Sequence, residues 1–316
     1  MKSYLEKRIT RFRAYQLGNA GSSFSYFDGT TITLIEARLT DLNRPRIDKE
    51  MEICGVSRIG CLHITSWDTD LNDLKEILKR YRPRHIEYPG YPPTSETAKE
   101  CLALIHGFQE LMGKAGVTVT IKRIDPQYIA SLNPALALGY QDVVYHPKYI
   151  SEKSNNNSTV KLFRTGIFNV ASLGDVEDLM IGAYLRRCRL FNSEVDILIL
   201  AHHGSENGLT TRKFLKTVKP TIAICSSNYD NQYEHPSEEI RQLLDEQEIP
   251  LYTTKTGDVA VQSVAPHTYA YKVINLRADS TEISSTADFL SKKSKKLSFN
   301  LDTIKNLYGP SRSFQH

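Results

Sequence analysis

Residues 195 to 205 read VDILILAHHGS, an apolar run of β type that ends in two histidines, a glycine and a serine. Such a run is typical of a buried strand, and open α/β architectures place their sites where buried strands end. Adjacent histidines at a strand end can also bond nearby backbone carbonyls and do nothing more. The stretch therefore indicates an α/β protein with a candidate site at this strand end.

Three further polar clusters follow apolar strands along the chain. They are SWDTD at 66–70, GD at 174–175, and SSNYDNQYEHP at 226–236. Each cluster supplies an aspartate or a histidine, the residue types that bind metals or carry protons in hydrolytic metal chemistry. Four such clusters in succession favour a shared site over four unrelated strand ends.

Each cluster also has a purely structural explanation. Asp68 and Asp70 can cap the helix expected to begin near Leu71, because a carboxylate accepts hydrogen bonds from free N–H groups at a helix start. Asp175 can cap the helix expected over 176–188 in the same way. His235, which precedes a proline, can be an ordinary turn residue. The joint occurrence of the clusters weakens all of these explanations together.

Alternating β and α patterns run through residues 12 to 276. A helical stripe is clearest at 94–116, where apolar residues recur at helical spacing between a Thr-Ser start and a closing glycine. Strands are expected at 31–37, 58–64, 117–123, 158–163, 167–173, 195–201, 221–227, 250–254 and 258–264. This order predicts an α/β fold of two mixed sheets with helices outside, and no Rossmann or Walker glycine motif is present.

The composition predicts a soluble protein of the cytoplasm. The chain has 316 residues, 40% of them hydrophobic. Its five cysteines are spread singly, which indicates reduced, buried thiols. No segment reaches the roughly 20 apolar residues of a membrane span, and the N-terminus lacks the apolar block of a signal peptide. We therefore expect no membrane contact.

The sequence divides into a hydrolase-like domain at 1–276 and a Ser/Lys-rich extension at 277–316. The extension has seven Lys or Arg and four Asp or Glu, so it carries +3 of the net charge of +4. Its few apolar residues favour a mobile or loosely docked segment, and the alternative is a basic arm that contacts phosphate or a partner protein.

Taken together, the clusters resemble the motifs of the metallo-β-lactamase superfamily, and within it the hydrolase domains of the ComEC/Rec2 competence type. The resemblance covers about residues 10 to 265, and the order of the motifs is kept. The matching segments are QLGNAGSS (16–23), LIEAR (34–38), SWDTDL (66–71), NNNSTVKL (155–162), LGD (173–175), HHGS (202–205) and NYDNQYEHP (228–236).

The resemblance implies an αβ/βα sandwich with a metal site at the edge between the two sheets, where a metal-activated water hydrolyses the substrate. It implies as metal ligands Asp68, Asp70, Asp175, His202 or His203, and His235. Asp70 or Asp175 would orient or deprotonate water, and His203 and Ser205 would steady a phosphate. The implied substrate is a nucleic acid or nucleotide.

The departures from the family pattern concern the H-x-D-x-D-H motif. Ser66 stands at its first histidine and Leu71 at its last, and Glu36 replaces an upstream aspartate. Leu71 fits the apolar face of the helix that follows, and strand geometry argues against His63 as a substitute ligand. The expected cofactor is Zn²⁺ or Mn²⁺, with Mg²⁺ as an alternative, because a site with fewer imidazoles favours metals that prefer oxygen.

Two classes of function follow. The first, which we favour, is an enzyme, a metal-dependent hydrolase of the phosphodiesterase or nuclease type with a reduced metal site. The second is a catalytically impaired member that serves as a binding or regulatory subunit, because two motif histidines are replaced. A weaker option within the fold is hydrolysis of a small ester, an amide or a cyclic nucleotide.

Overall fold

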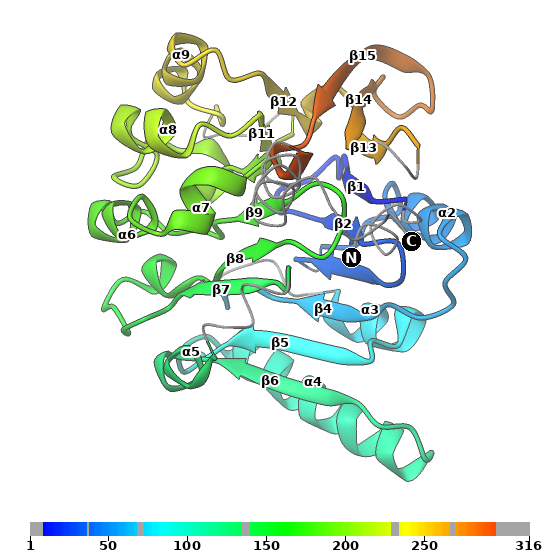
Figure 1. Ribbon diagram of the computed structural model, residues 1–316. Helices are drawn as coiled ribbons and strands as arrows, with labels where there is room; N and C mark the ends of the chain where they lie inside the picture. Colours follow the sequence, from blue (N-terminus) through cyan, green and yellow to red (C-terminus); the bar gives the residue numbers. More distant parts are fainter. Residues whose placement is uncertain are drawn as a thin grey trace, which may run out of the picture.

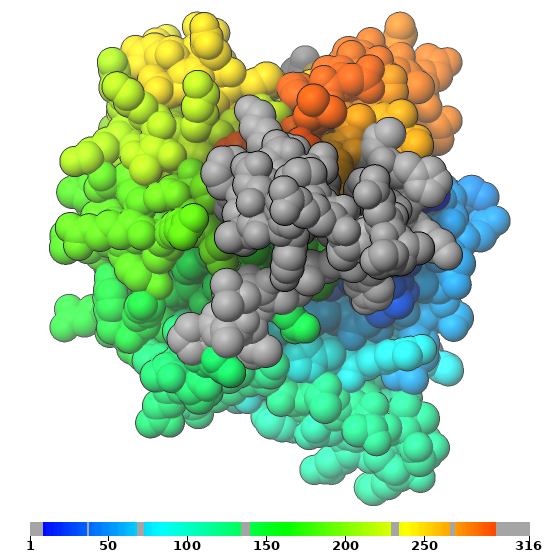
Figure 2. All heavy atoms as spheres, viewed as in Figure 1, coloured from blue at the N-terminus to red at the C-terminus, as the bar shows by residue number. Residues whose placement is uncertain are grey.

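A computed structural model describes residues 9–36, 38–67, 73–133, 140–228, 234–265 and 269–294. In these residues two mixed β-sheets face each other, and helices cover the outer face of each sheet (Figure 1). Figure 2 shows the same face with the green to yellow second half of the chain on the left and the blue to cyan first half on the right. The αβ/βα sandwich predicted from the sequence is confirmed.

The first sheet has nine strands in the described part of the chain, in the order β15-β14-β13-β1-β2-β3-β4-β5-β6. Its strands are β1 (Arg11–Ala14), β2 (Phe24–Phe27), β3 (Ile32–Ile35), β4 (Cys61–His63), β5 (His85–Pro89), β6 (Thr120–Ile124), β13 (Val259–Ser263), β14 (Ala270–Leu276) and β15 (Ile283–Leu290). Strands β3 to β6 run parallel, and the other pairs are antiparallel.

The second sheet has six strands among the described residues, in the order β12-β11-β10-β9-β8-β7. Its strands are β7 (Val143–His146), β8 (Val160–Phe163), β9 (Val170–Ser172), β10 (Ile197–Ile199), β11 (Ile222–Cys225) and β12 (Leu251–Thr253). Strands β9 to β12 run parallel, so their carboxyl ends lie at one edge. The Lys-Thr-Gly turn after β12 carries the chain back to β13 in the first sheet.

Two groups of helices form the outer layers (Figure 1). The first sheet is covered by α2 (Arg44–Ile53), α3 (Leu74–Tyr81) and α4 (Glu96–Lys114). The second sheet is covered by α6 (Leu179–Leu185), α7 (Arg189–Glu194), α8 (Arg212–Val218) and α9 (Glu238–Glu246). Helix α5 (Pro126–Ser131) follows β6. In α4, Ser95 caps the first turn and Cys101 and Ile105 are buried, which confirms the predicted helix and its apolar stripe.

Apolar side chains fill three layers. One cluster packs α3 and α4 on the first sheet, a second packs the later helices on the second sheet, and a third fills the space between the sheets. The third includes Phe24 from β2 and Phe163 from β8, which are 2% and 0% exposed. Within the described residues, no helix is long and apolar enough to cross a membrane.

The first part of the predicted C-terminal extension packs on the domain. Strand β15 pairs with β14, and the Lys292 backbone N–H donates to Asp196 Oδ1 at 2.8 Å. The Lys293 side chain is 0% exposed, and its ammonium group donates to the carbonyl oxygens of Arg164 and Gly166. Residues 295–316 of the extension lie outside the described residues.

Asp258 links three separate segments and gives a test of the fold. Its carboxylate, 0% exposed, lies 2.7 Å from Arg13 Nη2 and 2.6 Å from Arg46 Nη1, and it accepts the Gln16 N–H at 2.8 Å. Asp258→Ala is expected to lower the free energy of unfolding by about 3–5 kcal/mol, because two guanidinium groups lose their buried partner. Urea denaturation measures this change.

The matched control is Asp41→Ala, since the Asp41 side chain is 97% exposed in its ion pair with Arg44. A surface pair of this kind contributes less than about 1 kcal/mol. Equal stability of the Asp258 and Asp41 variants would contradict the role assigned to Asp258.

Candidate functional site

The carboxyl ends of β3, β9, β10 and β11 meet around two adjoining cavities. Glu36 and Asp175 line the first cavity, and His202 and His235 line the second, which has a volume of about 240 Å³. His203 lines both. The structure thus places the predicted GD, HHGS and H-P clusters together at one sheet edge, although they lie far apart in the sequence.

His202 and His203 occupy a turn directly after β10, with φ of 46° and 55°. Both lie in the left-handed region, which costs free energy for residues other than glycine and which clusters at functional sites. The turn is held by the His202 N–H, which donates to Gly174 O at 2.9 Å, and by the Ser205 N–H, which donates to His202 O at 2.9 Å. The strained backbone therefore fixes where both imidazoles project.

Glu177 orients His202, and the sequence analysis missed it. His202 Nδ1 lies 2.5 Å from Glu177 Oε1, with both side chains about one-third exposed. Asn155 Nδ2 donates to the same carboxylate oxygen at 3.3 Å, and Asn156 Oδ1 accepts the Glu177 N–H at 2.9 Å. A carboxylate on one ring nitrogen is the usual support for a metal-binding histidine, because it directs the other nitrogen to the ion.

The surroundings of His203 select its tautomer. Its Nδ1 lies 3.2 Å from the Ser226 carbonyl oxygen and 3.3 Å from Ser22 Oγ. A carbonyl oxygen can only accept, so Nδ1 carries the proton and neutral His203 has its lone pair on Nε2. This tautomer suits a metal ligand better than the predicted phosphate contact, which needs an N–H donor at Nε2.

His235 approaches the turn from the loop before α9. Its ring centroid lies 6.2 Å from that of His202, which in turn lies 6.2 Å from that of His203. Burial lowers the pKa of His235, and the neighbouring histidines and Lys255 act in the same direction. The lowered pKa favours neutral His235, the form in which imidazole binds metal.

Asp175 and Glu36 bring carboxylates to the first cavity from different sheets. Glu36 follows β3 with φ of 61°, is 5% exposed, and accepts a hydrogen bond from Thr65 Oγ1. Asp175 follows Gly174, whose φ is 55°. A Cβ at Gly174 would lie 2.7 Å from Ser158 Cβ, so only glycine fits before Asp175.

Two of the remaining predicted site residues fall outside the described part of the chain, and a third, Ser205, lies within it. Asp68, Asp70 and Leu71 lie outside the described residues. Ser205 is 9% exposed and is not among the described residues that line the two cavities. Its predicted contact with substrate stays a prediction.

The position of the missing first motif histidine is filled by a packed polar network. Ser66 is 0% exposed, and its Oγ lies 3.1 Å from Tyr91 Oη. The Trp67 N–H donates to the same hydroxyl at 2.9 Å. His63 is not a substitute ligand, because it is 0% exposed and its Nδ1 lies 2.8 Å from Glu87 Oε2.

The donor set suits a divalent cation in its chemistry, with three imidazoles near two carboxylates. Its described ligand atoms do not form a group of three within 4.8 Å of one another, a spacing that the described residues show elsewhere. The structure therefore brings together the later motifs of the predicted site. Two of the predicted carboxylate ligands, Asp68 and Asp70, belong to the segment outside the described residues.

Two known proteins are similar in sequence to parts of this chain. Over 205 residues the chain is 27% identical to ComE operon protein 3 of Bacillus subtilis (strain 168), a match that covers 63% of this chain and 24% of that protein. A stretch of 58 residues is 40% identical to Competence protein ComA of Neisseria gonorrhoeae, covering 18% of this chain and 8% of that protein. The chain thus spans about a quarter or less of the length of these relatives.

Two solved structures align with most of the chain at low sequence identity. The metallo-beta-lactamase fold protein YhfI from Bacillus subtilis aligns with a TM-score of 0.48 and 10% identity, over 80% of this chain and 100% of that one. The CmlA beta-hydroxylase E377D mutant aligns with a TM-score of 0.48 and 11% identity, over 79% and 53%. No protein-family model matches the sequence.

The sequence similarity and the architecture agree. The similarity reaches ComE operon protein 3 over 205 residues, and the described chain forms two facing mixed sheets between helices. The similarity to ComE operon protein 3 supports the predicted resemblance to the ComEC/Rec2 type, and the two facing sheets have the αβ/βα architecture that this resemblance implies.

Proposed function

We propose that this chain is a divalent-metal-dependent hydrolase of phosphodiesters, of the phosphodiesterase or nuclease type. The observation that carries the proposal is the meeting of His202, His203 and His235 with Asp175 at one sheet edge. Two of these histidines lie in left-handed backbone, a cost that persists where the surrounding structure and a function require it.

The proposed ligands are His202, His203, His235 and Asp175, together with Asp68 and Asp70. Zn²⁺ and Mn²⁺ are the expected ions, with Mg²⁺ as an alternative, because the set mixes imidazole nitrogens with carboxylate oxygens. Such an ion, when bound, lowers the pKa of a coordinated water and polarises a phosphoryl oxygen.

The chain's own residues orient the reactants. Glu177 holds His202 through Nδ1, and Ser226 O holds His203 through Nδ1, so both Nε2 atoms remain for binding. Asp175 lines the adjoining cavity, and in this proposal Asp175 or Asp70 orients or deprotonates the attacking water. In this proposal His203 is a ligand, whereas the sequence analysis assigned it to the phosphate.

An anionic substrate is supported by the charges near the second cavity. Lys255 brings a positive charge close enough to His235 to lower its pKa. A cavity with positive potential attracts phosphate groups and raises their local concentration. The branch that the chain resembles is linked to phosphodiester hydrolysis, and we propose a nucleic acid or nucleotide as the substrate and the cytoplasm as the location.

The second candidate function is a catalytically impaired binding or regulatory subunit. The Ser66 contact with Tyr91 favours it, because the place of a motif histidine has become part of the packed interior. Elemental analysis of protein purified without chelator separates the two. Metal that is present in the wild type and lost in His235→Asn supports the hydrolase, and equal metal content in the two proteins supports the binding subunit.

Asp175→Asn tests the hydrolase directly. This change removes the carboxylate charge while keeping the side-chain shape, so Mn²⁺-dependent cleavage of bis(p-nitrophenyl) phosphate is expected to fall by about 100-fold or more. The control is Asp178→Asn, because Asp178 caps α6 by accepting the Met180 N–H and asparagine caps equally well. An Asp175 variant as active as the Asp178 variant would overturn the assignment.

Glu177→Ala tests the orientation of His202. Without the carboxylate, the affinity for Mn²⁺ in calorimetric titration is expected to fall about 10- to 100-fold. The melting temperature is expected to stay near that of the wild type, because the Glu177 side chain is 30% exposed. Glu206→Ala, at an exposed glutamate just after the same turn, serves as the control. Unchanged affinity in Glu177→Ala would remove Glu177 from the site.

A further inference from the structure

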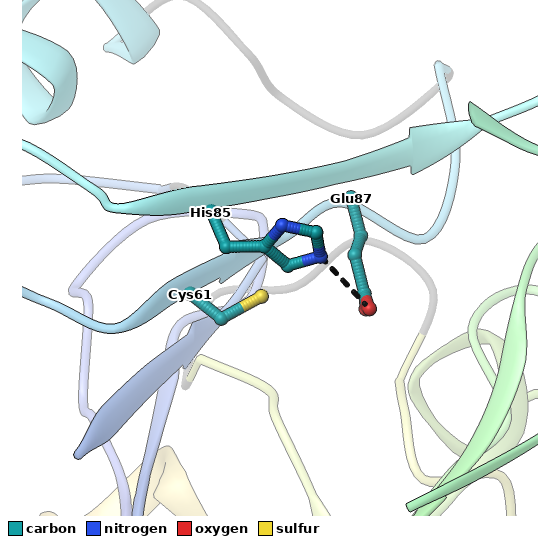
Figure 3. Close-up of side chains that lie close together, drawn as sticks. All are labelled: Cys61, His85 and Glu87. Carbon is teal, nitrogen blue, oxygen red and sulfur yellow. Dashed lines mark ion pairs between the residues drawn. The ribbon is translucent and has the colours of Figure 1, made fainter. Parts of the chain in front are cut away.

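A second group of metal-ligating side chains lies at the opposite ends of the strands. Cys61 is the first residue of β4, and His85 and Glu87 are the first and third residues of β5. Their ligand atoms lie within 4.8 Å of one another, the only such group of three among the described residues. Figure 3 shows the Cys61 sulfur and the Glu87 carboxylate on either side of the His85 ring.

Strand register alone produces this spacing. In the parallel pair β4 and β5, Cys61 is opposite His85 and His63 is opposite Glu87. Side chains two residues apart on a strand share a face, so all four project from one face of the first sheet. The intervening Leu62 is buried in the core under the helices. The cluster is therefore built on rigid strands rather than on loops.

Neighbouring groups orient two of the three ligands. His85 Nδ1 lies 2.8 Å from Thr120 Oγ1 on β6, so the ring turns Nε2 toward Glu87 Oε1, 3.4 Å away. Glu87 Oε2 lies 2.8 Å from both His63 Nδ1 and Lys161 Nζ. One carboxylate oxygen is thus fully engaged and the other faces the imidazole. Such outer hydrogen bonds fix the direction of metal ligands.

The charges at Glu87 keep it ionised in spite of its burial. Burial acts to raise the pKa of Glu87, but the charge of Lys161 and the hydrogen bonds from His63 and His85 outweigh it and hold the pKa well below its usual range. Lys161 also lies 3.6 Å from Asp142 Oδ2, so its charge is shared between two carboxylates. Lys161 and His63 therefore hold the Glu87 carboxylate in place beside His85.

The cluster opens on a cavity between the two sheets. This cavity, of about 340 Å³, is lined by all three ligand residues and by Asp142 and Lys161. The His85 side chain is 25% exposed, so an ion can enter from solvent. Three protein ligands beside open space match zinc sites that keep a fourth position for water or a small molecule.

We propose that Cys61, His85 and Glu87 bind one zinc ion, with the fourth position open to the cavity. A thiolate, an imidazole and a carboxylate are the three ligand types that zinc prefers. Zinc displaces the Cys61 thiol proton on binding, as thiolate ligation requires. The site ties β4 to β5 and is distinct from the candidate hydrolase site, which lies at the carboxyl ends of the strands.

Cobalt(II) titration of the full chain under reducing conditions tests the proposal. Cobalt(II) takes the place of zinc and gives a thiolate-to-metal charge-transfer band only when a cysteine is a ligand. The expected result is one equivalent with this band, lost in Cys61→Ser and kept in Cys188→Ser, the control at another half-buried free cysteine. The band is also expected to persist in His235→Asn, which separates this site from the hydrolase site.

Two substitutions keep the test decisive if Cys61→Ser does not fold. His85→Asn removes a ligand at a partly exposed position, and Thr120→Val removes only its orienting partner; each is expected to weaken cobalt binding by at least about 10-fold. Absence of the charge-transfer band in the folded wild type would overturn the proposal. So would wild-type cobalt affinity in both His85→Asn and Thr120→Val.

Discussion

Parallel strand pairing is the constraint on which the candidate site depends. In the second sheet Ile199 is level with Ser172 on β9 and with Ile224 on β11, so the polar residues after these strands emerge at one edge. In the first sheet the parallel pair β3 and β4 brings Glu36 and Thr65 to their own edge in the same way. The Thr159 N–H donates to Thr65 O at 2.8 Å and joins the two edges. Residues from distant motifs therefore share one place without any loop that reaches across the molecule.

The turn that carries His202 and His203 fixes the positions of both imidazoles at this edge. Left-handed conformations at two residues cost about 1–3 kcal/mol each, so the surroundings must hold them. Gly174 O accepts the His202 N–H at 2.9 Å, and Gly204 O accepts the Ser237 N–H at 2.9 Å. Asn155 donates to the Glu177 carboxylate that contacts His202. The NNNS, GD and HHGS segments are thus one supporting unit.

The sequence predicted the fold and the later motifs because their signals are local. Helix α4 has a cap, a continuous apolar stripe and a closing glycine, and the HHGS segment ends an unbroken apolar strand. Strand β15 was assigned to the extension, because its side chains are mostly exposed on both faces and give no apolar pattern. Glu177 and the Cys61, His85 and Glu87 cluster depend on strand register and loop contacts, which one sequence does not encode in any short stretch. The predictions for Asp68 and Asp70 fall outside the described residues and stay predictions.

The proposed divalent ion lies where the second sheet ends, among His202, His203, His235 and Asp175. Anomalous X-ray scattering from crystals of the full chain grown with Mn²⁺ or Zn²⁺ tests this claim most directly, because it locates the ion without any assumption about the reaction. The account predicts an anomalous peak bounded by the imidazoles of His202 and His235 and the carboxylate of Asp175. Crystals saturated with metal that show no peak at this sheet edge would contradict it.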